Sequence, residues 1–238
     1  MLIFAAGVAL MALALLSPLD AIAEEYLLSG HMLQHVLIGD AAAALIVLGV
    51  RGPLVFFLLP RSATLRLGRL APLRAVIRFL LRPQVSFAFW ALSLALWHIP
   101  RAYEYALTHP VVHDVEHASF VFTGVLVWTQ LIDPARRRAL QRGGRLVLAV
   151  ILFACGQVLA DVLVFSFDPL YGAYAAQDER LLGLSALADQ RLAGVVMMAE
   201  QLLTLGTCIT LLLLGAHREA AGRDGRATAA GQGYGVSP

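Results

Sequence analysis

The chain has 238 residues, of which 59% are hydrophobic and 14% are charged, and its mean hydropathy is +0.75. A water-soluble domain cannot keep so apolar a surface hydrated, so the composition predicts an integral membrane protein. Long uninterrupted apolar segments exclude a membrane β-barrel, whose strands would show short alternating segments. They favour helices, which satisfy their own backbone hydrogen bonds in lipid.

Six apolar segments are long enough to cross the hydrocarbon core as helices, which takes about 17 to 25 residues. In chain order they lie at about 2–18, 31–50, 84–100, 114–132, 146–166 and 190–214. Together with their connections they predict an all-α, polytopic transmembrane bundle that forms a single domain over 1–216. The Gly- and Ala-rich segment 217–238 is predicted to be a disordered cytoplasmic tail.

The first apolar segment could also be read as a secretion signal. It ends at Ser17-Pro18 and is followed by Ala21-Ile22-Ala23, which resembles a signal-peptidase site. A signal peptide normally starts with a basic region, which is missing here, so we expect the segment to be retained as a helix. Either outcome leaves the next five spans in the same orientation.

Arginine predicts the orientation, because the chain has no lysine and basic loops remain in the cytoplasm. Arginines concentrate in 51–82, in 133–145 and in the tail, whereas the opposite loops carry mostly Asp and Glu. Both termini are therefore predicted to be cytoplasmic. The basic segments, including a possible surface helix over 66–82, are expected to contact anionic lipid and not nucleic acid.

Five of the seven histidines lie at the outer ends of predicted spans. His31 and His35 are four residues apart at the start of the second span, so they share one helical face. His113 and His117 repeat this spacing at the start of the fourth span, and His98 reaches the same level at the end of the third. One such histidine is usually an interfacial polar residue, but two pairs and a fifth predict a periplasm-facing metal site.

Three further side chains lie at depths that allow them to join this layer. Asp161 is near the outer end of the fifth span, and Met197 and Met198 are about two turns into the sixth. Imidazole suits copper, zinc, iron and nickel, and thioether donors shift the preference toward Cu(I). Asp161 is a candidate ligand or a carboxylate that orients an imidazole, and methionines in helices more often serve packing.

Two acidic residues are predicted to lie near the middle of the membrane. Asp40 in the second span and Glu200 in the sixth are each about ten residues from the outer end. A carboxyl group at this depth is expected to be protonated or paired. The sequence leaves open whether the two have a structural role or handle protons or ions.

Four segments carry a resemblance to a known family: His31-Met32-Leu33-Gln34-His35; Trp97-His98-Ile99-Pro100; His113-Asp114-Val115-Glu116-His117 with Gly124 and Trp128; and Asp189-Gln190-Arg191-Leu192-Ala193-Gly194-Val195-Val196-Met197-Met198. Over most of 26–214 the chain resembles the multispan CtaG-type cytochrome c oxidase assembly factors. The resemblance implies an inner-membrane protein required for maturation of a haem-copper oxidase, with copper as the metal handled. Many members have a tryptophan soon after the Gly-x-x-Met element, where this chain has Met198.

The residues also allow three other interpretations. The sequence His113-x-x-Glu116-His117 fits a zinc hydrolase motif in which the glutamate acts as a base, with Asp161 as a candidate further ligand. Two histidines on facing helices also fit the axial ligands of a haem-binding membrane cytochrome. In the third interpretation the protein is an assembly scaffold that binds no metal.

Our main prediction is a copper-binding protein that hands its metal to a haem-copper oxidase subunit, without turnover of a substrate. His31, His35, His113 and His117 are the primary candidate ligands and His98 is the next. Asp161, Met197 and Met198 are auxiliary. The sequence predicts membrane lipid as the other partner and leaves the oligomeric state open.

Overall fold

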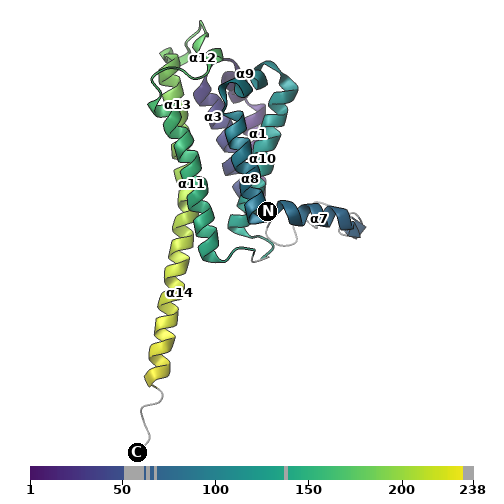
Figure 1. Ribbon diagram of the computed structural model, residues 1–238, viewed down its shortest axis with the longest axis vertical. Coiled ribbons are helices and arrows are strands. Elements are labelled where there is room, and N and C mark those ends of the chain that lie inside the picture. Colours follow the sequence, from purple (N-terminus) through teal and green to yellow (C-terminus); the bar gives the residue numbers. More distant parts are fainter. Residues whose placement is uncertain (51–61, 63–64, 67–68, 137–138, 233–238) are drawn as a thin grey trace, which may run out of the picture.

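The computed structural model describes residues 1–50, 62, 65–66, 69–136 and 139–232. Within these ranges the chain forms helices joined by turns and loops, with no β-strand, which confirms the all-α prediction (Figure 1). The N-terminal part contains α1 (Leu2–Leu16), α2 (Pro18–Glu25), α3 (Leu28–Val36), the π-helical turn η1 (Leu37–Ala41) and α4 (Ala42–Gly49). These five elements run as two adjacent, nearly continuous helical rods.

The remaining elements begin after a segment that is largely outside the described residues. They are α7 (Ala71–Leu80), α8 (Pro83–Trp97), α9 (Pro100–Thr108), α10 (Pro110–Ile132), α11 (Arg142–Phe165), α12 (Gly172–Ala175), the 3₁₀ turn η2 (Leu181–Gly183), α13 (Ala186–Gln201), the π-helical turn η3 (Leu202–Gly206) and α14 (Thr207–Gln232). The sequence predicts a basic surface helix over 66–82. Within that range the structure has the helix α7, which carries exposed apolar side chains. The rest of that prediction lies partly outside the described residues.

Four helical stretches are long and apolar enough to cross a membrane: Leu28–Gly49, Pro110–Ile132, Arg142–Phe165 and Ala186–Glu219. Two bent pairs, α1 with α2 and α7 with α8, meet the same criterion only when each pair is taken together. Their bends are 49° and 69°. The structure therefore fits a membrane bundle with four to six spans.

Both bends occur where a proline begins the second helix. Pro18 opens α2 and Pro83 opens α8, and the preceding residues, Ser17 and Arg82, are extended. A residue before proline is disfavoured in the α region because its backbone clashes with the proline ring. The predicted span at about 2–18 corresponds to α1, which ends at Leu16, and only together with α2 beyond the bend is it long enough to cross a membrane.

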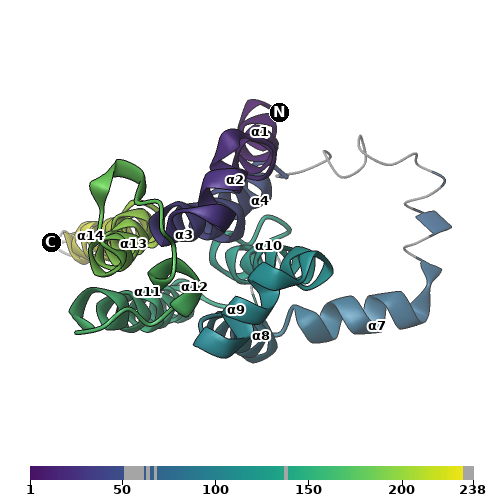
Figure 2. The same ribbon diagram turned by 90° about the horizontal axis from the view of Figure 1, so that it is seen from above.

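The rod formed by α3, η1 and α4 lies at the centre of the bundle. Helix α13 packs against α3 and α11 packs against α13, while α10 contacts both η1 and α4 and also packs against α8. Seen from above, α13 and α11 lie on one side of α3, and α10 lies on the other (Figure 2). The short helices α9 and α12 lie at the end where α3 and α10 begin (Figure 1).

Buried apolar side chains form two clusters, one in each half of the bundle. The cluster nearer α9 and α12 contains Leu28, Met32, Tyr103, Ala160, Leu163, Tyr171, Tyr174, Ala193 and Met197. Many large apolar residues on the spans face outward instead, such as Val158 and Leu203, which are 64% and 73% exposed. Outward apolar surface of this kind is expected where lipid surrounds the protein.

The C-terminal segment differs from the sequence prediction. Residues 217–238 are predicted to be disordered, but α14 continues as a helix to Gln232. Alanine has the highest helix propensity, and no proline interrupts the segment before Pro238. The preceding apolar helix is already formed and serves as the nucleus for helix growth, so adding further turns costs little free energy.

Candidate metal centre

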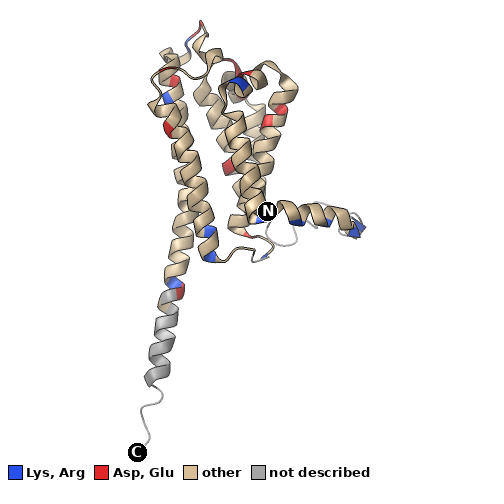
Figure 3. Ribbon diagram, in the orientation of Figure 1, with Lys and Arg blue, Asp and Glu red and all other residues tan. Residues whose placement is uncertain are grey.

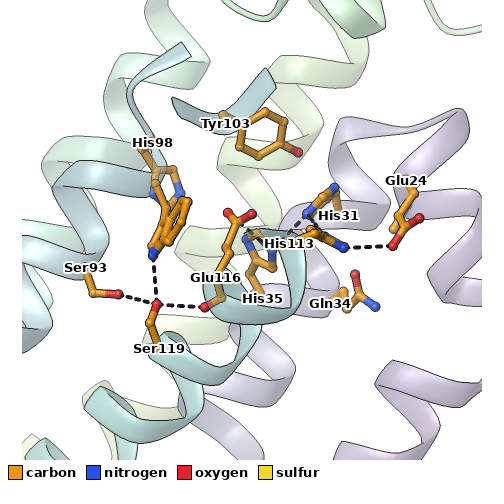
Figure 4. A network of polar contacts seen from close by, with 12 residues as sticks. Glu24, His31, Gln34, His35, Ser93, His98, Tyr103, His113, Glu116 and Ser119 are labelled. Atoms are coloured by element: carbon orange, nitrogen blue, oxygen red, sulfur yellow. Dashed lines mark hydrogen bonds and ion pairs between the residues drawn. The ribbon is translucent and has the colours of Figure 1, made fainter. Parts of the chain in front are cut away.

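Two helices bring their histidine pairs to one point inside the bundle. His31 and His35 lie on α3, and His113 and His117 lie on α10. Each of the four residues offers a ligand atom, and these atoms all lie within 4.8 Å of one another. All four side chains are buried. We call this group the histidine cluster; Figure 4 shows three of its members, His31, His35 and His113, lying close together.

The distances between ring nitrogens range from a hydrogen-bond contact to somewhat more than the spacing around a metal ion. Nε2 of His31 lies 2.8 Å from Nε2 of His35 and 3.4 Å from Nε2 of His113. The rings of His113 and His117 have centroids 4.1 Å apart. Metal–imidazole bonds of about 2.0–2.1 Å in a tetrahedral site place the nitrogens about 3.3 Å apart. The cluster therefore needs little rearrangement to surround one ion.

A tyrosine fixes the orientation of His31. The hydroxyl of Tyr174 donates to the carbonyl oxygen of Ala23 at 2.7 Å and lies 2.9 Å from Nδ1 of His31. Burial raises the pKa of the Tyr174 phenol above its usual range, so the phenol keeps its proton. Because that proton is directed to Ala23, Nδ1 of His31 donates to the tyrosine oxygen, and Nε2 keeps the lone pair that a metal requires.

A carboxylate does the same for His113. Nδ1 of His113 lies 2.9 Å from Oε1 of Glu24, near the end of α2 (Figure 4). The imidazole donates its Nδ1–H to this carboxylate, so its Nε2 faces the cluster with a free lone pair. The lone pair of His31 Nε2 then accepts a hydrogen bond from Nε2–H of His35 at 2.8 Å, and Nε2 of His113 lies 3.4 Å away. A metal ion bound here would take the place of the His35 Nε2 proton.

Glu116 is a buried carboxylate beside the cluster. It is 1% exposed, and Oε1 lies 3.8 Å from Nε2 of His35. Within the described chain neither of its oxygens has a hydrogen-bond partner. Sequence reasoning considered this residue only as the base of a zinc hydrolase. Its position in the sequence indicates that it lies beside the cluster, because Glu116 directly precedes His117 on α10 and follows His113 by three residues.

Asp189 holds the beginning of α3 in place. Its carboxylate accepts hydrogen bonds from the backbone N–H of Leu28 at 2.7 Å and of Ser29 at 3.1 Å, and from the hydroxyl of Ser29 at 2.5 Å. A carboxylate at a helix N-terminus satisfies N–H groups that have no partner within the helix. The sequence alone shows Asp189 only as part of a family-like motif. Its role as a cap of α3 cannot be seen there, because its partners are about 160 residues away along the chain.

The other candidate ligands lie outside the histidine cluster. His98 follows the end of α8, and its Nδ1 donates to the carbonyl oxygen of Leu94 at 2.8 Å. Asp161 is half-buried and accepts from Gln157 at 3.4 Å. Met197 is buried and lines a cavity that also contacts His35 and His98, whereas Met198 is half-buried against the apolar core.

The tryptophan of the Trp97-His98 motif ties α8 to α10. Nε1 of Trp97 donates to the hydroxyl of Ser119 at 2.8 Å, and Ser93 contacts the same hydroxyl at 2.9 Å. Ser119 in turn donates to the carbonyl oxygen of Glu116 at 2.7 Å (Figure 4). This network fixes the rotation of α10, and with it the direction of its histidines.

Comparison with known proteins identifies the family. A family model described as the cytochrome c oxidase caa3 assembly factor matches residues 1–219, which include the whole histidine cluster. Searches of curated proteins and of solved structures returned no match. The family match confirms the resemblance drawn from the sequence motifs. This membrane protein therefore belongs to the cytochrome c oxidase caa3 assembly factor family.

Proposed function

We propose that the protein binds copper at the histidine cluster and passes it to a subunit of a haem-copper oxidase during assembly. The convergence of four buried imidazoles within 4.8 Å carries this proposal. Two of them are held by Tyr174 and Glu24 so that Nε2 faces the cluster. Without a metal, a proton lies between Nε2 of His31 and Nε2 of His35, and a metal ion that replaces this proton would find the imidazole nitrogens already gathered as a ligand set.

The donor chemistry favours copper over other metals. For a given set of nitrogen donors, copper binds most tightly among the common divalent metals. Two thioether side chains, Met32 and Met197, are buried in the same region and line the cavity next to His35. Thioether suits Cu(I), so the surroundings can accommodate both oxidation states.

A site that hands over its metal needs a route to the partner. Glu24, which contacts His113, has a side chain that is 42% exposed, so the cluster reaches the surface at this edge. Most described arginines lie at the opposite end of the bundle and on α7, while the end near α9 and α12 carries frequent acidic residues and a few arginines (Figure 3). By the positive-inside rule the cluster then faces the periplasm.

Metal analysis of the detergent-purified protein tests this proposal. The variant His31→Ala/His35→Ala/His113→Ala/His117→Ala, called the cluster variant below, removes all four imidazoles. The matched control is His109→Ala/His217→Ala, which removes two exposed histidines elsewhere. After anaerobic copper loading, we expect wild type and control to bind at least one more copper ion per chain than the cluster variant.

The other outcomes each identify an alternative. A Soret absorption band in the wild-type protein would indicate haem, and zinc with hydrolytic activity would indicate a hydrolase centred on Glu116. Equal copper in wild type and cluster variant, with both folded, would indicate a scaffold and overturn the proposal. A second experiment measures oxidase copper content in cells that carry only the cluster variant, which we expect to be reduced.

A further inference from the structure

A cavity extends from the histidine cluster toward the middle of the membrane. It has a volume of about 70 Å³ and is partly open. Apolar side chains such as Trp90, Leu94 and Phe120 form much of its wall, and its polar lining consists of His35, His98, Asp40, Thr123, Glu200 and Gln201, with Met197 beside them. Because His35 belongs both to the cluster and to this wall, the two sites adjoin each other. A site for one water needs only about 10–15 Å³, so the cavity has room for a metal ion with a few waters. We call it the central cavity.

Acceptor atoms in the central cavity have few donors. Glu200 is 9% exposed and interacts with Asp40, but neither of its oxygens makes a hydrogen bond of regular geometry to any described residue. Oε1 of Gln201, which is 6% exposed, also has no partner among the described residues. The same holds for Nε2 of His98. These atoms share one property, which is that they are buried on residues that line the cavity and have no hydrogen-bond partner among the described residues.

Asp40, by contrast, is firmly held. Its Oδ1 accepts from Nε1 of Trp128 at 2.5 Å, and its Oδ2 accepts from the hydroxyl of Thr204 at 3.3 Å. Donors on two neighbouring helical segments therefore keep this carboxyl facing Glu200. Asp40 is therefore the fixed member of this acidic pair, and Glu200 is the less constrained one.

Both acidic residues lie at irregular turns of their helices. Asp40 is within the π-helical turn η1, and Glu200 lies just before the π-helical turn η3. Such turns are rare and are frequent at functional sites, because they alter the side-chain register of a helix locally. Residues of both π-helical turns line the central cavity, and this backbone feature points to a functional site independently of the acidic side chains.

We propose that the central cavity is a second cation-binding site, which holds a copper ion between the histidine cluster and the middle of the membrane. Glu200 is its main ligand, with Asp40 as the second carboxylate. Gln201, Met197 and His98 supply further oxygen, sulfur and nitrogen donors. This mixed set suits a transition metal and supplies the negative charge that a buried cation needs. The proposal extends the proposed function, in which the cluster alone binds the metal.

Copper stoichiometry tests the second site. Full-length protein in detergent is titrated anaerobically with Cu(I) against a chromophoric chelator. We expect two ions per chain in wild type, one in Asp40→Asn/Glu200→Gln, and one in the cluster variant. The matched control is Asp178→Asn/Glu179→Gln, which removes two exposed acids in the loop after α12, and it should bind two.

The possible failures can be told apart. If wild type binds one ion that the cluster variant loses and Asp40→Asn/Glu200→Gln keeps, the second site is wrong and the cluster proposal stands. The acidic pair would then be two carboxyls that share a proton. If wild type binds no copper, both proposals fail. Should Asp40→Asn/Glu200→Gln unfold in a thermal scan, the cluster variant decides: one retained ion supports the site and none overturns it.

Discussion

At the scale of single residues, two histidines of the cluster are oriented in the same way by different partners. His31 donates its Nδ1–H to a phenol and His113 donates to a carboxylate. In both cases the outer hydrogen bond selects the tautomer whose Nε2 faces inward. Removing such a partner commonly lowers metal affinity about 10- to 100-fold, because the ring loses its orientation and basicity.

This predicts the effect of replacing Glu24. Glu24→Ala removes the partner of His113 while leaving all four imidazoles in place. We expect copper affinity at the cluster to fall by about 10-fold or more, with stoichiometry unchanged, because His113 loses its fixed tautomer. A competition titration against a Cu(I) chelator measures this change.

The neighbouring residue provides a matched control for that change. Glu25 is exposed in the same last turn of α2, so Glu25→Ala alters net charge and helix propensity equally. Its copper affinity should equal that of wild type. Equal losses in both variants would show that overall charge, and not the contact with His113, determines the affinity.

At the scale of helices, the position of the cluster depends on how closely α10 approaches the central rod. A Cβ added at Gly124 would lie 1.8 Å from the carbonyl oxygen of Gly39 in η1. Only glycine at this position permits the contact, since the obstacle is backbone and cannot move aside as a side chain can. The crossing lies about two turns below His117 on the same helix.

The variant Gly124→Ala should therefore be strongly destabilised. Overpacking of a close contact costs about 1–3 kcal/mol, and here α10 must shift as a whole. We expect a lower midpoint of thermal unfolding in detergent, together with weaker copper binding because the two histidine pairs separate. Gly143→Ala on α11 is the matched control, because a Cβ there meets nothing within 4 Å. An unchanged midpoint in Gly124→Ala would contradict the packing seen here.

Hydrogen bonds between distant segments complete the arrangement of the helices. Asp189 on α13 caps α3, and Gln190 accepts from the N–H of Leu170 at 2.6 Å and donates to the carbonyl oxygen of Leu163 at 3.3 Å. The start of α13 thus anchors both the helix that carries His31 and the loop that leads to Tyr174. In this protein the first residues of the motif that starts at Asp189 hold α13, α3 and the loop after α11 together through hydrogen bonds.

At the scale of the whole molecule, charge is distributed unevenly along the bundle axis. Arg142 and Arg145 lie at one end, where Arg145 contacts Asp133 at 3.1 Å, and the histidine cluster lies toward the other. This asymmetry predicts that both termini are cytoplasmic and that the loop between α12 and α13 is periplasmic. The proposed copper site would then open to the periplasmic side of the membrane.

Reporter fusions check this orientation. Green fluorescent protein fused to the C-terminus should fluoresce, and alkaline phosphatase at the same position should be inactive. Alkaline phosphatase inserted at Asp178 should be active, because this enzyme folds only in the periplasm. The reverse pattern would place the histidine cluster on the cytoplasmic side and remove the proposed route to the oxidase.

The sequence by itself determined the helical membrane class, the position of most spans and the pairing of histidines within a helix. These depend on composition and on distances along one chain segment, which hydropathy and the helical repeat specify. It also carried the family motifs. It assigned His98 and Asp161 to the same layer as the histidine pairs but could not show which helices are neighbours.

Only the tertiary structure decided that α3 and α10 face each other and that His98, Asp161 and Met198 lie outside the four-histidine cluster. It also revealed Tyr174, Glu24 and Asp189 as partners that fix the geometry. Depth in a membrane restricts a side chain to a layer, whereas neighbours within that layer are set by helix packing and rotation. Those depend on contacts between residues far apart in the chain, such as Gly39 with Gly124, which no local pattern encodes.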